Sequence, residues 1–309
     1  KPLSKLSKSL ELWHRRLFLL LSGTIILSNI VSNILEVQLS HSTQIVALLI
    51  AVAVTGLPHG ALDPLVARRA KLWRRGSGLL AFSLLYVFIA GAVFYLWVLF
   101  PGTTLAILLA LSVWHFSGDW RAALPRSRCV AAATAVISAP AFWHHSEVVE
   151  LFSYLAPAHA QLLASFMYCL APVSLLSLVI VLGRARNKIP KVEMNTPLLI
   201  ELGVLMLAAA LLSPLVYFLV YFCLLHSPRH LLAVTRGFER IEVISYGVIF
   251  TLLSLSLALV TFFLLPDTGL DERLAQIVFI GLLALTVPHM LITEHASKLT
   301  TPQPPRSAT

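Results

Sequence analysis

Long apolar runs follow one another along the chain, separated by short segments that carry most of the charged residues. A helix that crosses a membrane needs about 20 apolar residues, each adding about 1.5 Å. On this criterion the pattern predicts ten spans, at about residues 17–35, 44–67, 78–99, 103–120, 128–146, 160–183, 197–212, 214–234, 243–265 and 273–296. Hydropathy alone also allows nine crossings, because the run at 197–212 is short. We therefore expect an all-α, polytopic transmembrane helical bundle.

The composition supports a membrane protein. Of 309 residues, 58% are hydrophobic and only 12% are charged, and the mean hydropathy is +0.86. A soluble domain usually has about a quarter of its residues charged. These values exclude a water-soluble globular enzyme and a disordered chain. The net charge of +9 is expected to orient the protein in the bilayer rather than to bind nucleic acid.

The distribution of Lys and Arg predicts the topology. If the N-terminus is cytoplasmic, 22 of the 23 basic residues fall on that side of a ten-span arrangement, and only Arg273 falls outside. Lys and Arg are retained in cytoplasmic loops, so both termini are expected to be cytoplasmic. The expected location is the cell inner (cytoplasmic) membrane, as a multi-pass protein. No small-residue cleavage site follows the apolar run from Leu17, so that run is expected to remain as a span.

Five histidines are predicted to lie at one depth in the membrane. Counting 1.5 Å per residue, each is roughly 6–12 Å above the inner end of its span. Four even-numbered spans carry them, and ionisable groups at such depth usually face the bundle interior. We therefore expect one convergent site, with a metal as its occupant, although a neutral imidazole bonded across helices remains an alternative for each one. These residues are His59, His115, His226, His230 and His289.

The local spacing favours metal binding. His226 and His230 are four residues apart, so one helix face presents both rings. His59–Asp63 and His115–Asp119 have the same spacing, and each carboxylate could accept the second N–H of the histidine on its own helix. A simple buried hydrogen bond is the alternative for each pair. Helix-interrupting residues accompany these histidines and fit irregular backbone lining a cavity, or ordinary kinks: Gly56, Pro58, Gly60, Gly118 and Pro228.

The donor set and its neighbours narrow the chemistry. Imidazoles without thiolates suit Zn, Cu, Fe or Ni, and no HExxH motif supports a zinc protease. Four neutral imidazoles would leave Fe(II) positively charged, with open positions for O2. Six nearby aromatic residues suit a long hydrophobic substrate arriving through lipid, or simple helix packing. They are Trp114, Phe116, Tyr217, Phe218, Tyr221 and Phe222.

Four segments carry a recognisable pattern: Gly-Leu-Pro-His-Gly-Ala-Leu-Asp at 56–63, Trp-His-Phe at 114–116, His-Ser-Pro-Arg-His at 226–230 and Val-Pro-His-Met-Leu at 287–291. Together they resemble the Brp/Blh family of bacterial and archaeal integral-membrane β-carotene 15,15′-dioxygenases. The similarity runs from about residue 44 to 295. It implies O2-dependent cleavage of the central 15,15′ double bond of β-carotene, or of a related carotenoid, to two molecules of retinal. It also implies a functional link to a retinal-binding rhodopsin.

The resemblance also implies roles for individual residues. Fe(II) would be held by His59, His115, His226 and His230, while Asp63, Asp119 and His289 would support these ligands or face the substrate. Three parts of the chain are then expected: a basic cytoplasmic N-terminal segment (1–16), a single transmembrane catalytic domain (17–297) and a disordered cytoplasmic tail (298–309).

Two other functions remain open from the residues alone. A desaturase- or hydroxylase-like membrane oxygenase would need more histidine boxes than this chain has. A transporter for a metal ion, a proton or a solute could use buried His and Asp residues as a path.

Overall fold

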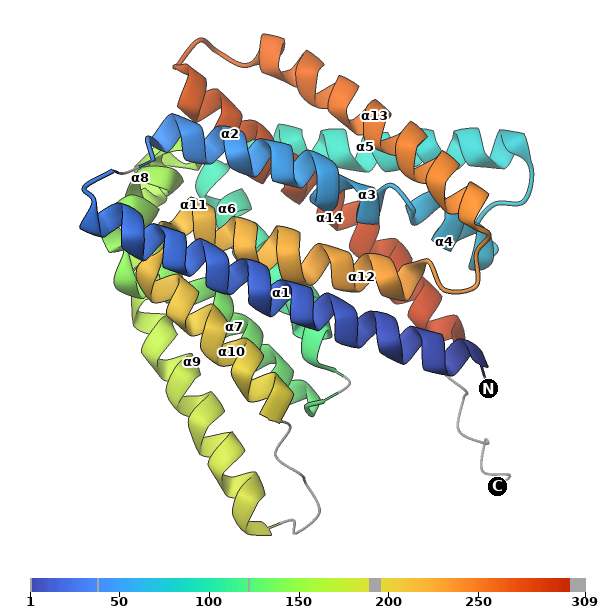
Figure 1. The fold of residues 1–309 in the computed structure, drawn as a ribbon. Helices are drawn as coiled ribbons and strands as arrows, with labels where there is room; N and C mark the ends of the chain where they lie inside the picture. The colour runs from blue at the N-terminus through green and yellow to red at the C-terminus, as the bar shows by residue number, and fades with distance from the viewer. Residues whose placement is uncertain (1, 38, 122, 189–195, 301–309) are drawn as a thin grey trace, which may run out of the picture.

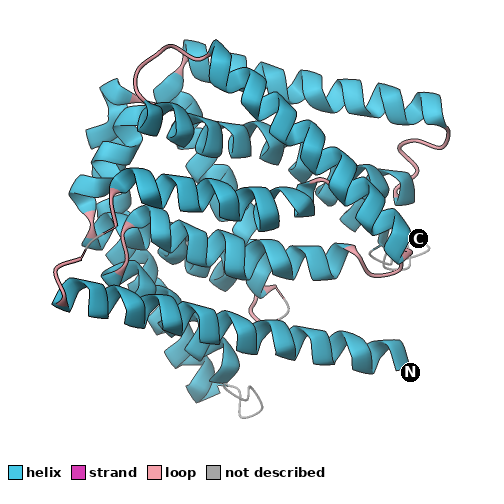
Figure 2. Cartoon of the chain, turned by 45° about the horizontal axis from the view of Figure 1, so that its top comes forward, coloured by secondary structure: helices cyan, strands magenta, loops and turns pink. Residues whose placement is uncertain are grey.

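The computed structural model describes residues 2–37, 39–121, 123–188 and 196–300, and every regular element in these ranges is helical (Figures 1 and 2). The elements in chain order are α1 (Pro2–Ile34), α2 (His41–Ala51), η1 (Val52–Gly56), α3 (Leu57–Gly60), α4 (Asp63–Arg69), α5 (Gly76–Leu99), α6 (Pro101–Phe116), η2 (Ser117–Trp120), α7 (Arg126–Trp143), α8 (His145–Leu155), η3 (Pro157–His159), α9 (Ala160–Lys188), α10 (Thr196–Leu211), α11 (Pro214–Phe218), η4 (Leu219–His226), α12 (Ser227–Val234), α13 (Arg240–Leu264) and α14 (Leu270–Thr300).

The predicted all-α membrane bundle is confirmed. Each predicted span coincides with one helix or with a run of consecutive helices. Within the described ranges, seven helical segments are long and apolar enough to cross a membrane. The predicted spans at 103–120, 128–146 and 197–212, which coincide with α6–η2, α7 and α10, are not among those seven. The number of ten crossings and the cytoplasmic side of the termini remain predictions.

The chain ends differ from expectation in detail. The basic N-terminal segment is part of α1, which begins at Pro2. Helix α14 continues through Thr300, into the predicted tail at 298–309. Residues 301–309 lie outside the described residues, so the disordered tail stays a prediction. The start of α1 and the end of α14 lie at the same end of the bundle (Figures 1 and 2).

Helix α8 is an element that the hydropathy pattern did not predict. It carries buried Val148, Leu151, Phe152 and Leu155 on one face and polar residues on the other. This spacing is the amphipathic pattern of a helix lying against a core, and its 11 residues are too few for a span.

Helix α14 is the central support of the histidine-bearing half of the bundle. It packs against α2, α4, α5, α8 and α13. In Figure 1, α5 and α13 run along one side of α14, whereas α1, α7, α9 and α10 form the opposite half. The interior between these layers is the place where irregular helical segments meet.

Two π-helical segments, η1 and η4, and one 3-10 segment, η2, interrupt the regular helices beside the predicted histidines. The expectation of broken helices there is confirmed. Pro228 has no N–H to give to the carbonyl of Leu224, and the Nε2 atom of His14 lies 3.0 Å from that oxygen instead. Short π segments are frequent at functional sites, so this backbone irregularity points to the same region as the histidines.

Candidate metal centre and its cavities

Five histidines from five elements form one buried cluster. His59 comes from α3, His115 from α6, His226 from the end of η4, His230 from α12 and His289 from α14. The ring centroid of His59 lies 5.7 Å from that of His226 and 5.3 Å from those of His230 and His289. The His289 ring is also 5.2 Å from His115 and 5.0 Å from His230. The predicted convergence of these five residues is therefore present.

The donor atoms of this histidine cluster fit a shared metal ion. The Nε2 atoms of His115 and His226 are 3.1 Å apart, a spacing that suits two imidazoles each about 2.1 Å from one ion. Potential ligand atoms of His59, His115 and His226 all lie within 4.8 Å of one another. Three further buried ring nitrogens, Nδ1 of His59 and Nε2 of His230 and His289, have no hydrogen-bond partner among the described residues. Buried polar atoms normally have a partner, and a bound cation would provide one.

A carboxylate fixes the ring of His289. The Nδ1 atom of His289 lies 2.7 Å from Oδ1 of Asp63, and both side chains are almost fully buried. The hydroxyl of Tyr86 donates to Oδ2 of the same Asp63 at 2.9 Å. If Nδ1 of His289 carries the proton, Nε2 of the same ring keeps its lone pair and could bind a metal ion shared with the other histidines. This is the arrangement by which carboxylates orient metal-binding histidines.

A second carboxylate fixes the ring of His226. The Nδ1 atom of His226 lies 3.1 Å from each carboxylate oxygen of Asp119, and the Tyr221 hydroxyl donates to Asp119 at 2.9 Å. Arg229 donates to the backbone carbonyl of Asp119 at 3.1 Å and to the carboxylate of Glu201 at 2.7 Å. Hydrogen bonds with Tyr221, His226 and Arg229 therefore fix the position of Asp119.

The predicted same-helix pairs, His59–Asp63 and His115–Asp119, are wrong. Each carboxylate instead bonds to a histidine on another helix. A turn at residues 61–62 separates α3 from α4, and the 3-10 segment η2 carries Asp119, so neither pair follows regular α-helical spacing. The four-residue spacing does hold for His226 and His230, whose rings stack at 6.2 Å.

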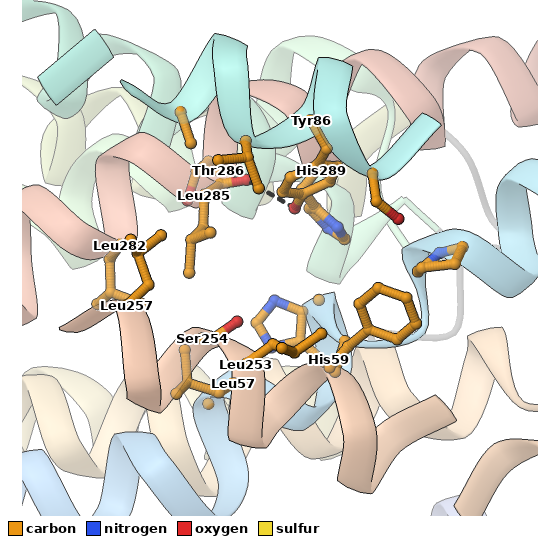
Figure 3. Close-up of a pocket in the computed structure, with 18 of the residues that line it drawn as sticks. Leu57, His59, Tyr86, Leu253, Ser254, Leu257, Leu282, Leu285, Thr286 and His289 are labelled. Atoms are coloured by element: carbon orange, nitrogen blue, oxygen red, sulfur yellow. Dashed lines mark hydrogen bonds between the residues drawn. The ribbon is translucent and has the colours of Figure 1, made fainter. Parts of the chain in front are cut away.

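Two apolar cavities meet at the cluster. The first apolar arm lies between α3, α5, α13 and α14, and the second lies between α6, α7, α8 and the α11–η4 segment. Both are lined mainly by apolar side chains, and they share His59, Phe222, Leu282 and Thr286. Figure 3 shows His59 and His289 near one another on the wall of the first arm, with Leu257 and Leu282 to their left. The cluster therefore lies where two apolar spaces join.

The six predicted substrate-facing aromatics divide into two groups. Phe116, Tyr217, Phe218 and Phe222 line the second apolar arm, and their contact with a substrate stays a prediction. Tyr221 instead supports Asp119, and Trp114 is half-buried under the guanidinium of Arg126, 4.3 Å from its ring centroid. Trp114 lines a separate, polar cavity with Arg121, Arg229 and Glu294, which reaches His115, His226 and His230 from another side.

Two supporting residues were missed from the sequence. Glu201 is buried and accepts hydrogen bonds from Arg229 and from the indole of Trp120. It is the single charged residue in the predicted span at 197–212, and that rarity was a usable signal. Tyr86 lies in an otherwise apolar run, and no sequence pattern singled out its contact with Asp63.

Comparisons with known proteins identify the family. The sequence profile described as "Beta-carotene 15,15′-dioxygenase" matches residues 50–296, which include all five clustered histidines. A relative of the same name from uncultured marine bacterium 66A03 is 31% identical over 266 residues, covering 79% of this chain and 92% of the relative. No solved structure matches significantly. The chain therefore belongs to the β-carotene 15,15′-dioxygenase family of carotenoid-cleaving enzymes.

Proposed function

We propose that the protein cleaves the central 15,15′ double bond of β-carotene with O2, giving two molecules of retinal, at an Fe(II) ion held by His59, His115, His226 and His230. One observation carries this proposal: the histidine cluster lies at the junction of two apolar arms. A linear polyene with two equal halves could place one half in each arm. Its central bond would then be next to the cluster.

The neutral imidazoles are well suited to ferrous iron. They bind without cancelling the charge of the ion, and no thiolate contributes to the cluster. A ferrous ion bound there would supply the activation of O2 that oxidative cleavage requires. Asp119 fixes the orientation of His226, and Asp63 fixes that of His289, so both rings present Nε2 to the same space.

The side chains around the cluster would bind and align the substrate. Phe222 lines both arms, and its ring centroid lies 5.8 Å from that of His59 and 5.7 Å from that of His226. It could therefore contact the polyene beside the reacting bond. Apolar walls also exclude water from the site. The distance that each half of the substrate can enter its arm would decide which double bond lies next to the metal. No side-chain nucleophile or general base is required of the chain.

The proposed substrate and product also suggest where the protein acts and which protein would use its product. β-Carotene dissolves in lipid, so a multi-pass protein of the inner membrane can receive it from the bilayer. The product retinal would supply a retinal-binding rhodopsin, and no nucleic acid takes part.

Expression in cells that accumulate β-carotene tests the proposal. The expected result is loss of pigment, retinal detected by chromatography, and iron in the purified protein. Unchanged carotenoid and iron-free protein would overturn it. Bound iron without carotenoid loss would favour another membrane oxygenase, and ion or solute flux without iron would favour a transporter.

A further inference from the structure

A third apolar cavity, of about 480 Å³, lies outside the first arm. It is bounded by α5, α13, α14 and the α2–η1 segment, and we name it the lipid-side cavity. Leu57, Val87, Ser254 and Leu285 line both this cavity and the first arm. The two spaces therefore form one apolar route, whose inner part is visible in Figure 3.

The wall of this route reaches the outer surface of the bundle. Val87 on α5 is 52% exposed, and Leu257 and Leu264 on α13 are 44% and 79% exposed. No residue of α13 is buried. In a membrane, apolar side chains so exposed face lipid tails, so the lipid-side cavity borders the bilayer rather than the protein interior.

Helix α13 packs against α3, α4 and α14, and two of its charged or aromatic side chains make contacts near its ends. Near its start, Arg68 forms an ion pair with Glu242 at 2.7 Å. Near its finish, the guanidinium of Arg273 lies 4.1 Å from the ring centroid of Phe262. The segment between these contacts, around Ser254 and Ala258, borders the cavities. A helix with few buried contacts can move outward at low cost, and here that movement would widen the route.

Small residues keep the route open. A Cβ atom built on Gly91 of α5 or on Gly281 of α14 would meet no heavy atom within 4 Å. Both glycines line the lipid-side cavity, together with Ala258 of α13. Larger side chains at these positions could therefore enter the cavity without clashing with the backbone.

We propose that the gap between α5 and α13 is a lateral portal, through which a linear apolar polyene passes from the bilayer to the histidine cluster. The apolar cleavage product leaves by the same route. The identity of this ligand rests on the proposed function, whereas the portal itself rests on the continuity of the cavities and on the exposed wall of α13.

Uptake measured without O2 tests the portal separately from the chemistry. Iron-loaded protein in lipid nanodiscs is mixed anaerobically with vesicles that carry β-carotene, and quenching of tryptophan fluorescence reports binding. O2 is then admitted after equilibration, and retinal is measured. We expect Gly91→Phe and Ala258→Phe to slow uptake at least tenfold, while the iron content and the cleavage rate of already bound carotenoid stay within twofold of wild type.

Neighbouring substitutions serve as matched controls. Ala92 and Leu259 are exposed on the same two helices and do not line the cavity, so Ala92→Phe and Leu259→Phe should keep the wild-type uptake rate. Unchanged uptake in the portal variants, or equal slowing in the controls, would overturn the portal. If the Phe variants do not fold, Gly91→Leu and Gly281→Leu replace them with the same expectation. Wild-type protein that takes up carotenoid through the portal and forms no retinal would instead refute the proposed function alone.

Discussion

The Nδ1 atom of His289 lies 2.7 Å from Oδ1 of Asp63, although the two residues are 226 positions apart in the chain. This contact joins α14 to the start of α4 inside the bundle. It also sets the direction of the imidazole, because the ring cannot turn without breaking a buried hydrogen bond. The pair therefore links the packing of two helices to the geometry of the histidine cluster.

Removing the Asp63 carboxylate should weaken iron binding. Residues that orient metal-binding histidines typically change metal affinity by about 10- to 100-fold when they are replaced. Asp63 orients His289, which supports the four proposed ligands, so we expect Asp63→Ala to lower the affinity for Fe(II) by about tenfold, the lower end of that range. Tyr86→Phe should have a smaller effect because one partner of Asp63 remains. Competition with a chelator of known affinity measures both. The control is Asp267→Ala, since that carboxylate is 90% exposed; an equal loss of affinity in the control would contradict the assignment.

The histidines should differ in how strongly iron depends on them. His226→Ala removes a nitrogen that is 3.1 Å from His115, so we expect loss of both bound iron and cleavage. His289→Ala should also lower iron affinity, because its free Nε2 belongs to the same cluster. Metal analysis of purified protein gives the result. His295→Ala is the matched control, since His295 is exposed on the same helix as His289. Full activity in His226→Ala would remove that residue from the ligand set.

A methyl group at Gly56 should disturb the centre. A Cβ atom there would lie 2.8 Å from Cε1 of Phe222, which is closer than such contacts allow. The displaced Phe222 ring lies next to His59 and His226, so we expect Gly56→Ala to lower both thermal stability and cleavage. Overpacking of this kind costs about 1–3 kcal/mol. Thermal melting and retinal formation measure the two effects. Gly203→Ala is the control, because a Cβ atom there meets nothing within 4 Å.

The second apolar arm should set the position of cleavage. Ser112 lines that arm, whereas Ala110 of the same helix is exposed and does not. Filling the arm with Ser112→Phe should block one half of the substrate, so we expect at least a tenfold lower kcat/KM for β-carotene with unchanged iron content. Product chromatography and metal analysis make the measurement. Ala110→Phe should behave as wild type, and unchanged kinetics in Ser112→Phe would show that the substrate does not occupy this arm.

The helices and the histidine cluster were predictable because the membrane imposes simple rules. A span must be apolar over about 20 residues, and a constant rise places residues at calculable depth. Five histidines at one depth in four spans could therefore be expected to meet. Only their depth followed from the sequence, and not their contacts, since the facing side of each helix depends on packing.

The partners of the carboxylates could not be predicted by counting along a helix. Regular spacing relates Asp63 to His59, but the turn at 61–62 directs Asp63 to His289 on a helix more than 200 residues later. In the same way, a 3-10 segment places Asp119 next to His226 rather than His115. A short turn or 3-10 segment within a helix changes which side chains are neighbours, but it leaves the hydropathy pattern unaltered.

The π segment η4 has a consequence for how the chain can change in length near this site. A π turn contains one more residue than an α turn, so removing a single residue between Leu219 and Cys223 would restore a regular α-helix. Because the extra residue is absorbed within the wider turn, the residues that follow would keep nearly the same orientation after such a deletion. In a regular α-helix, by contrast, losing one residue rotates every later residue by about 100° about the helix axis. The π segment is therefore a place where the helix can lose a residue while His226 and His230 still face His59.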